Sequence, residues 1–141
     1  MKAASAKETE QAWRLLVSLV METRGAWRRK VTEATGLSFS RVRALKRLQD
    51  EPRTLRDLAD EMGIDAPAAT VLVNDLEARG LAKRHAHPEN RRAKLVSLTK
   101  EGTRILAKLG EIDDPPPPAF ASLPAVQVDA LRRVLSKVDP E

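Results

Sequence analysis

The stretch from Thr54 to Thr99 constrains the fold of this chain most, because it carries the start and stop signals of two short helices in quick succession. Thr54 is followed three residues later by Asp57, a variant of the capping box that binds the first free amides of a helix. Gly63 permits the left-handed turn that ends this helix. Apolar residues between these signals repeat at the spacing of one helix face, at Leu55, Leu58, Ala59 and Met62.

A second helix is predicted directly afterwards. Asp65 is suited to cap it, Pro67 is tolerated in its first turn, and Gly80 ends it. Two short helices joined by a tight, glycine-containing turn are typical of a helix-turn-helix. The inward face of the second helix is expected to hold Ala69, Leu72, Val73 and Leu76.

After Gly80 the pattern changes from that of helices to that of strands. Leu81–Ala86 and Lys94–Leu98 are short strand-like runs, and the polar, proline-containing segment His87–Arg92 lies between them. A hairpin that follows a helix-turn-helix makes a winged helix, and this hairpin carries arginines at its tip. We therefore predict a mainly α-helical fold with a small β-hairpin wing, in the α+β class.

Three motifs, in order and at matching spacing, resemble the MarR family of bacterial transcription regulators. They are LEARGL at Leu76–Leu81, PENRR at Pro88–Arg92 and VSLTKEG at Val96–Gly102. The resemblance extends more loosely from about Lys7 to Val138. It implies a winged helix-turn-helix with N- and C-terminal dimerisation helices.

The sequence departs from this family at two places. The wing of the family usually reads Asp-Pro-x-Asp-x-Arg, whereas His87 and Asn90 replace both aspartates here. In the family the second aspartate braces the arginine that enters the minor groove, so we expect Asn90 to hold Arg92 less firmly. The predicted recognition helix also has no Lys or Arg between Asp65 and Ala78, where family members often carry an arginine.

The two ends of the chain are predicted to form the dimer. Residues Lys7–Thr23 are apolar around nearly the whole helix, and a helix of this kind is buried on more than one side. Ser122–Val138 is a second amphipathic helix. We expect both to pack in a homodimer through Trp13, Leu16, Leu19, Val20, Leu131, Val134, Leu135 and Val138.

Two further helices and a spacer complete the predicted order. Ser38 and Thr99 are each suited to cap a helix, and the second of these runs to about Ile112. The segment Asp113–Pro118 stops it, and its four prolines favour an extended, stiff spacer. We therefore divide the chain into an N-terminal dimerisation region (1–36), a winged helix-turn-helix lobe (37–99) and C-terminal dimerisation helices (100–141) with a Pro-rich spacer at 115–118.

Positive charge is concentrated on the predicted winged helix. The chain has a net charge of +5, yet residues 24–104 alone carry 18 Lys and Arg against 11 Asp and Glu. Such a footprint suits a phosphate backbone. Aromatic residues make up only 3% of the chain, which disfavours single-stranded nucleic acid held by stacking. The absence of cysteine excludes disulfides, thiolate metal sites and cysteine-based redox sensing.

No catalytic or metal constellation is indicated, and we expect no enzyme activity and no cofactor. His85 and His87 are separated by one residue on a strand and therefore share one face. They could be two metal ligands, but no third ligand is evident, so we favour the interpretation as wing histidines near phosphate. Asp113 and Asp114 lie beside the prolines and are interpreted as a helix stop. No apolar run approaches ~18 residues and no signal-peptide pattern opens the chain, so a cytoplasmic protein is expected.

These features predict a sequence-specific regulator of transcription that binds double-stranded DNA as a homodimer on a pseudo-palindromic operator. The resemblance implies a repressor, the commonest role in the family, and a small-molecule effector that weakens DNA binding. Asn74 is the natural base reader, because a carboxamide can bond adenine through two hydrogen bonds. The residues predicted to contact DNA are Thr54, Arg56, Pro67, Ala68, Thr70, Val71, Asn74, Lys83, Arg84, Arg91, Arg92 and Lys94.

The uncharged recognition helix leaves an alternative open. Asp75, near the end of that helix, would repel phosphate. In this alternative, the chain is a winged-helix dimer that acts mainly as a protein-interaction or ligand-sequestering module with reduced DNA binding. Against this alternative stand the arginines of the wing and the net positive charge of the whole segment.

Overall fold

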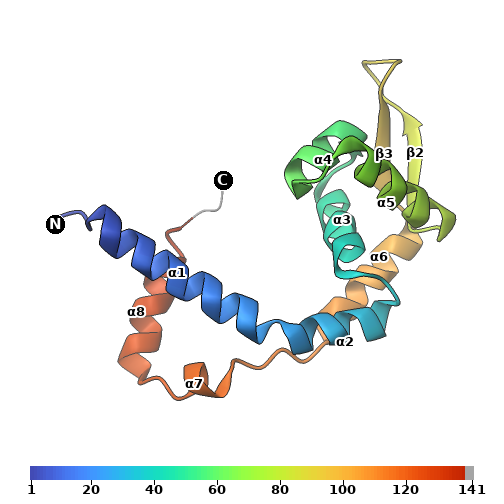
Figure 1. Ribbon diagram of the computed structural model, residues 1–141. Helices are drawn as coiled ribbons and strands as arrows, with labels where there is room; N and C mark the ends of the chain where they lie inside the picture. Colours follow the sequence, from blue (N-terminus) through green and yellow to red (C-terminus); the bar gives the residue numbers. More distant parts are fainter. Residues whose placement is uncertain (139–141) are drawn as a thin grey trace.

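Two parts make up residues 1–138, which the computed structural model describes: a mainly helical lobe with a small sheet at one side, and an arm of two helices that extends away from it (Figure 1). The arm consists of α1 (Ala6–Thr23) and α8 (Ala125–Leu135). The short helix α7 (Pro118–Ala121) lies in the connection back to the arm. The lobe contains α2 (Gly25–Thr35), α3 (Phe39–Asp50), β1 (Arg53–Thr54), α4 (Leu55–Met62), α5 (Ala66–Ala78), β2 (Ala82–Ala86), β3 (Lys94–Leu98), α6 (Lys100–Ala107) and a 3-10 turn (Lys108–Glu111).

The sheet has three antiparallel strands in the order β1-β3-β2. β2 and β3 form the predicted wing, with Arg84 opposite Val96. The edge strand β1 was not predicted from the sequence; its two residues pair with β3, and Thr54 lies opposite Leu95. The predicted class, mainly α-helical with a small β-hairpin wing, is confirmed.

Local hydrogen bonds fix the starts of α4, α5 and α6 as the sequence predicts. The side chains of Thr54, Asp65 and Thr99 each accept a hydrogen bond from the backbone N–H three residues later, at 3.1, 2.7 and 3.0 Å. Gly63 ends α4 with a φ of 65°, a left-handed conformation that costs glycine little. The caps and this turn set the helix-turn-helix made by α4 and α5.

The buried apolar core lies entirely in the lobe among the residues described. The predicted inward face of α5 is fully confirmed, since Ala69, Leu72, Val73 and Leu76 are all buried. The core also extends beyond residues 37–99, because α2 contributes Val31 and α6 contributes further side chains. The principal core residues are Val31, Leu37, Val42, Leu45, Leu48, Leu58, Met62, Leu72, Val73, Leu76, Leu81, Val96, Ile105 and Leu106.

Helix α6 closes the lobe by an approach that only glycine permits. A Cβ atom at Gly102 would lie 2.3 Å from the carbonyl oxygen of Leu81 and 2.6 Å from the side chain of Leu98. Thr99 strengthens this junction, because its hydroxyl donates a hydrogen bond to the carbonyl of Gly80 at 2.7 Å. The base of the wing and the start of α6 are therefore held as one unit.

The C-terminal segment differs from its prediction in two respects. The last helix was predicted over Ser122–Val138, but α8 is shorter, and Ser122 instead caps the C-terminal end of α7. Pro124 explains the later start, because its ring fixes a φ suited to a helix entrance and it has no N–H to continue a preceding helix. Pro118 also begins α7 rather than extending the spacer. Residues 139–141 of the predicted C-terminal region lie outside the described residues.

The arm leaves apolar side chains uncovered. Within residues 1–138, neither α1 nor α8 contains a buried residue, and Trp13 on α1 is 65% exposed. Of the residues predicted to form the dimer, only Leu16 and Leu131 are half-buried. The exposed ones are Trp13, Leu19, Val20, Val134, Leu135 and Val138.

Candidate nucleic-acid interface

Helix α5 presents a compact outward face with little charge. One side of this helix packs on the core of the lobe, so the residues on the opposite side face away from the protein. All of those predicted to contact DNA on this helix are exposed, and Val71 has 64% of its surface free. They are Pro67, Ala68, Thr70, Val71 and Asn74.

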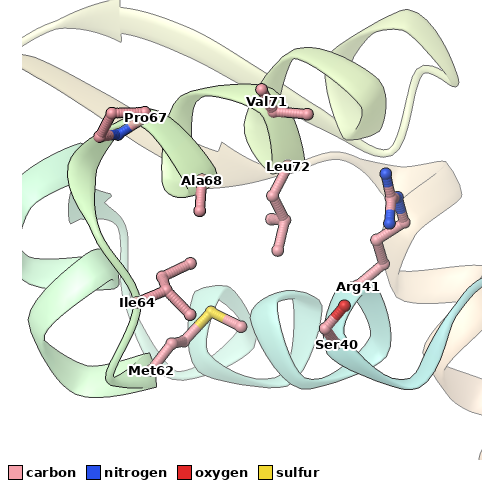
Figure 2. A pocket seen from close by; sticks show the side chains of 8 residues that line it. All are labelled: Ser40, Arg41, Met62, Ile64, Pro67, Ala68, Val71 and Leu72. Atoms are coloured by element: carbon pink, nitrogen blue, oxygen red, sulfur yellow. The ribbon is translucent and has the colours of Figure 1, made fainter.

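A hollow of about 380 Å³ lies beside this face, between α3, α4 and α5. Figure 2 shows Ala68 and Leu72 pointing into it from α5, with Ser40 and Arg41 on the opposite wall. Val71 stands at its rim. One edge of the recognition helix is therefore not backed by packed side chains.

The wing tip carries exposed cations on a backbone held by short-range hydrogen bonds. The side chain of Asn90 accepts a hydrogen bond from the backbone N–H of Arg92 at 3.1 Å, and His87 Nδ1 accepts one from the N–H of Glu89 at 3.1 Å. Asn90 thus fixes the main chain at Arg92 rather than its guanidinium group. Five of the cations predicted to contact DNA are exposed, namely Arg56, Lys83, Arg91, Arg92 and Lys94. Thr54, also predicted to contact DNA, is half-buried at the start of α4.

Arg84 is placed differently from the other cations predicted to contact DNA. Its Nη2 donates a hydrogen bond to Oδ1 of Asn74 at 2.6 Å, and its Nη1 donates one to Glu77 at 3.3 Å. Its backbone N–H donates to the same Glu77 carboxylate at 3.0 Å. Arg84 therefore joins the wing to the recognition helix. No local signal in the sequence points to this bridge, since Arg84 and Asn74 belong to different elements ten residues apart.

The negative charge of Asp75 is compensated within the lobe by two arginines. Its carboxylate accepts hydrogen bonds from Arg41 Nε at 2.5 Å and Arg79 Nε at 2.9 Å. The hydrogen bond from Arg41 is the main reason that the pKa of Asp75 lies below its ordinary value, and Arg79 lowers it further. The repulsion of phosphate that we expected from Asp75 is correspondingly reduced. The Arg79 partner could have been found from its i, i+4 spacing, whereas Arg41 lies on α3 and could not.

Within residues 1–138, no three His, Asp or Glu side chains are grouped closely enough to hold a metal ion. In the same range, none of the helices combines the length and the apolarity that crossing a bilayer requires.

Comparison with known proteins identifies the family. Residues 35–93, which span α3 to the wing tip, match the family model described as MarR family. An uncharacterised protein of Mycobacterium tuberculosis is 30% identical over 99 residues, covering 68% of this chain and 69% of that protein. The chain belongs to the MarR family. The motifs at the end of the recognition helix and at the wing tip are thereby placed in the family to which they were assigned.

Solved structures agree with this MarR-family assignment over nearly the whole chain. Wild-type MarR from E. coli has a TM-score of 0.70 at 20% identity, covering 99% of this chain and all of that one. A second neighbour is Sco3205, a MarR family transcriptional regulator from Streptomyces coelicolor, whose structure is a complex with DNA. It has a TM-score of 0.64 at 18% identity and covers 96% of this chain and 88% of that one. This chain has the fold of the MarR-family transcriptional regulators.

Proposed function

We propose that this protein is a sequence-specific transcription regulator that binds double-stranded DNA through α5 and the wing. The observation that carries the proposal is the joining of the two elements by Arg84, which holds the exposed face of α5 beside the exposed cations of the wing. A helix of this size fits the major groove, and arginines at a hairpin tip suit the adjacent minor groove.

Affinity and specificity come from different residues in this proposal. Arg91 and Arg92 at the tip, with Lys83 and Lys94 on the strands, supply attraction to phosphate and to a narrow minor groove. Base readout rests on the carboxamide of Asn74 and on the methyl groups of Thr70 and Val71. Methyl-bearing side chains favour thymine, and arginine in the minor groove favours A·T-rich segments, so we expect an A·T-rich operator.

The proposed DNA-binding form is a homodimer. The uncovered apolar side chains of α1 and α8 support this, because an aliphatic surface of that extent on a single chain is typical of an interface. Two lobes related by a two-fold axis place two recognition helices in successive major grooves. The operator would then be a pseudo-palindrome with half-sites ~10 base pairs apart.

We place the regulator as a repressor that a small-molecule effector releases, the role that family membership favours. This can be tested on the DNA upstream of its own gene with a transcription reporter. Repression by the intact protein and relief by a small molecule would support it, and activation would contradict it.

One of the two observations that favoured the alternative, a protein-interaction or ligand-sequestering module, is weakened by the structure. It rested on a recognition helix without cations and on the charge of Asp75, and that charge is compensated by Arg41 and Arg79. Reduced DNA binding is therefore not required by the electrostatics of α5.

A salt titration of DNA affinity tests the proposal. Changing Arg91 and Arg92 together to alanine should weaken binding to every sequence and flatten the salt dependence by roughly one unit for each lost phosphate contact. The matched control changes Arg132 and Arg133 to alanine, which removes the same charge from exposed positions on α8. Equal losses in the two variants would show that net charge alone, and not the wing, governs binding.

A further inference from the structure

The wing contains one cation that is withdrawn from solvent. Along β2, side chains alternate between the two faces of the hairpin, and Arg84 shares its face with the buried residue Ala82. Only 21% of the Arg84 side chain is exposed, and its Nε is buried without a hydrogen-bond partner within residues 1–138. Lys83, its neighbour, lies on the other face and is exposed. Arg84 is therefore poorly placed to bind phosphate, whereas Lys83 is well placed.

The guanidinium of Arg84 instead spans two residues of the recognition helix. Asn74 and Glu77 lie three positions apart on α5 and hence on one face of it. The carboxylate of Glu77 accepts hydrogen bonds from both the side chain and the main chain of Arg84. These contacts compensate the charge of Arg84 and fix the position of its backbone, from which the side chain starts. The other end of the guanidinium donates to Oδ1 of Asn74 at 2.6 Å, a short hydrogen bond from a charged donor.

This contact determines the orientation of the Asn74 carboxamide. A carboxamide has a donor end and an acceptor end, and a free asparagine can offer either end to a base. With the guanidinium beside it, the oxygen must face Arg84, because the amide nitrogen there would set donor against donor. The N–H groups of Asn74 are then directed away from Arg84 and remain available to an acceptor.

We propose that Arg84 is a positioning residue for base readout, which orients the carboxamide of Asn74 without contacting DNA itself. The inference rests on the proposed function, since it assigns a role within the same interface. Asn74 oriented in this way donates to acceptors in the major groove, namely N7 of a purine, O6 of guanine or O4 of thymine. Cytosine offers only a donor there and is disfavoured at the base that Asn74 faces.

Selection from a random DNA pool, followed by competition at single base positions, tests this role. Asn74→Ala should abolish discrimination at one position of each half-site. Arg84→Met keeps an unbranched side chain but removes the guanidinium donors, and it should lower discrimination at that same position by roughly tenfold while leaving the other positions unchanged. The double variant should lose no more discrimination than Asn74→Ala alone, because Arg84 acts only through Asn74.

Lys83→Met is the matched control. It removes the same charge from the adjacent residue, and it should weaken binding to all sequences equally and lower the salt slope by about one unit. If Arg84→Met behaves like this control and keeps the wild-type base preferences, Arg84 is a phosphate contact and the inference is wrong. A wild-type protein that selects no sequence would instead contradict the proposed function itself.

A measurement on the free protein covers the case in which Arg84→Met does not fold. Arg84→Lys retains the charge but has a single donor centre, which cannot reach Glu77 and Asn74 together in the manner of a guanidinium. The NMR signals of the Asn74 side-chain amide should shift in this variant, while those of the other asparagine, Asn90, stay in place. Unchanged Asn74 signals would overturn the inference without reference to DNA.

Discussion

The lobe and the arm both contain many apolar residues but use them differently. In the lobe, side chains from α2 to α6 bury one another, and Leu45, Leu58 and Leu76 have no exposed surface. On α1, Leu15 and Met21 remain about two-thirds exposed, at 65% and 66%. The helix itself is well formed, because Ser5 and Glu8 make a complete capping box at its start. Local signals are thus sufficient to form α1, whereas burial of its apolar side chains is what the proposed homodimer would supply.

The largest effect is expected from charge placed on the arm. Changing Leu16 and Leu19 together to glutamate would bury unpaired carboxylates at the proposed interface, at a cost to association of about 3–5 kcal/mol. Sedimentation should then show a monomer whose lobe still unfolds cooperatively. The control adds two glutamates to the polar stripe of the same helix, at Gln11 and Ser18, and should stay dimeric. A double leucine variant that sediments like the wild type would contradict the difference between arm and lobe.

A cavity in the lobe should have the next largest effect. Leu58 is fully buried in α4, and its replacement by alanine should lower the free energy of unfolding by about 2–5 kcal/mol, as measured in urea. Leu15→Ala, the same change on an exposed site of α1, should leave the unfolding of the lobe nearly unaltered. Similar losses at both sites would show that the arm and the lobe share one core.

A methyl group at Gly102 tests the closure of the lobe by α6. The added Cβ would overlap the carbonyl of Leu81, so the helix must move, and overpacking of this kind costs about 1–3 kcal/mol. Thermal unfolding should show the loss. Gly110→Ala is the control, because nothing lies within 4 Å of a Cβ at that position. Equal melting temperatures for Gly102→Ala and the wild type would contradict this packing.

The smallest effect concerns pH and the link between α3 and α5. The pKa of Asp75 is lowered from 3.8, chiefly by the hydrogen bond from Arg41. A carboxyl with a lowered pKa stabilises the folded state above its ordinary value, and this contribution is lost as the pH falls through the lowered one. Asp75→Asn should therefore reduce the urea midpoint at neutral pH, and the difference from the wild type should shrink in acid. A difference that is independent of pH would show that the charge of Asp75 contributes nothing.

Elements with local signals could be predicted from the sequence. Thr54, Asp65 and Thr99 cap helices with their own side chains, and Gly63 marks a turn by its conformational freedom, so no distant residue is needed to recognise them. The apolar spacing within α5 likewise identified its buried face. This covers most of the winged helix.

Features that depend on residues far apart could not be predicted. β1 is only two residues long and is defined by its pairing with β3. The ion pair of Arg41 with Asp75 joins positions 34 apart, and the bridge from Arg84 to Asn74 depends on how the wing folds back on α5. The residues predicted to contact DNA and to form the dimer stay predictions. Most of them are exposed, which is compatible with these roles but does not test them, whereas Arg84 is half-buried against α5.

Enrichment from a random DNA pool by the wild-type chain tests most directly whether the arm pairs two lobes that each read DNA. We expect an A·T-rich consensus made of two inverted half-sites ~10 base pairs apart, one for each recognition helix. A pool without enrichment, a single half-site or a consensus dominated by G·C pairs would contradict it.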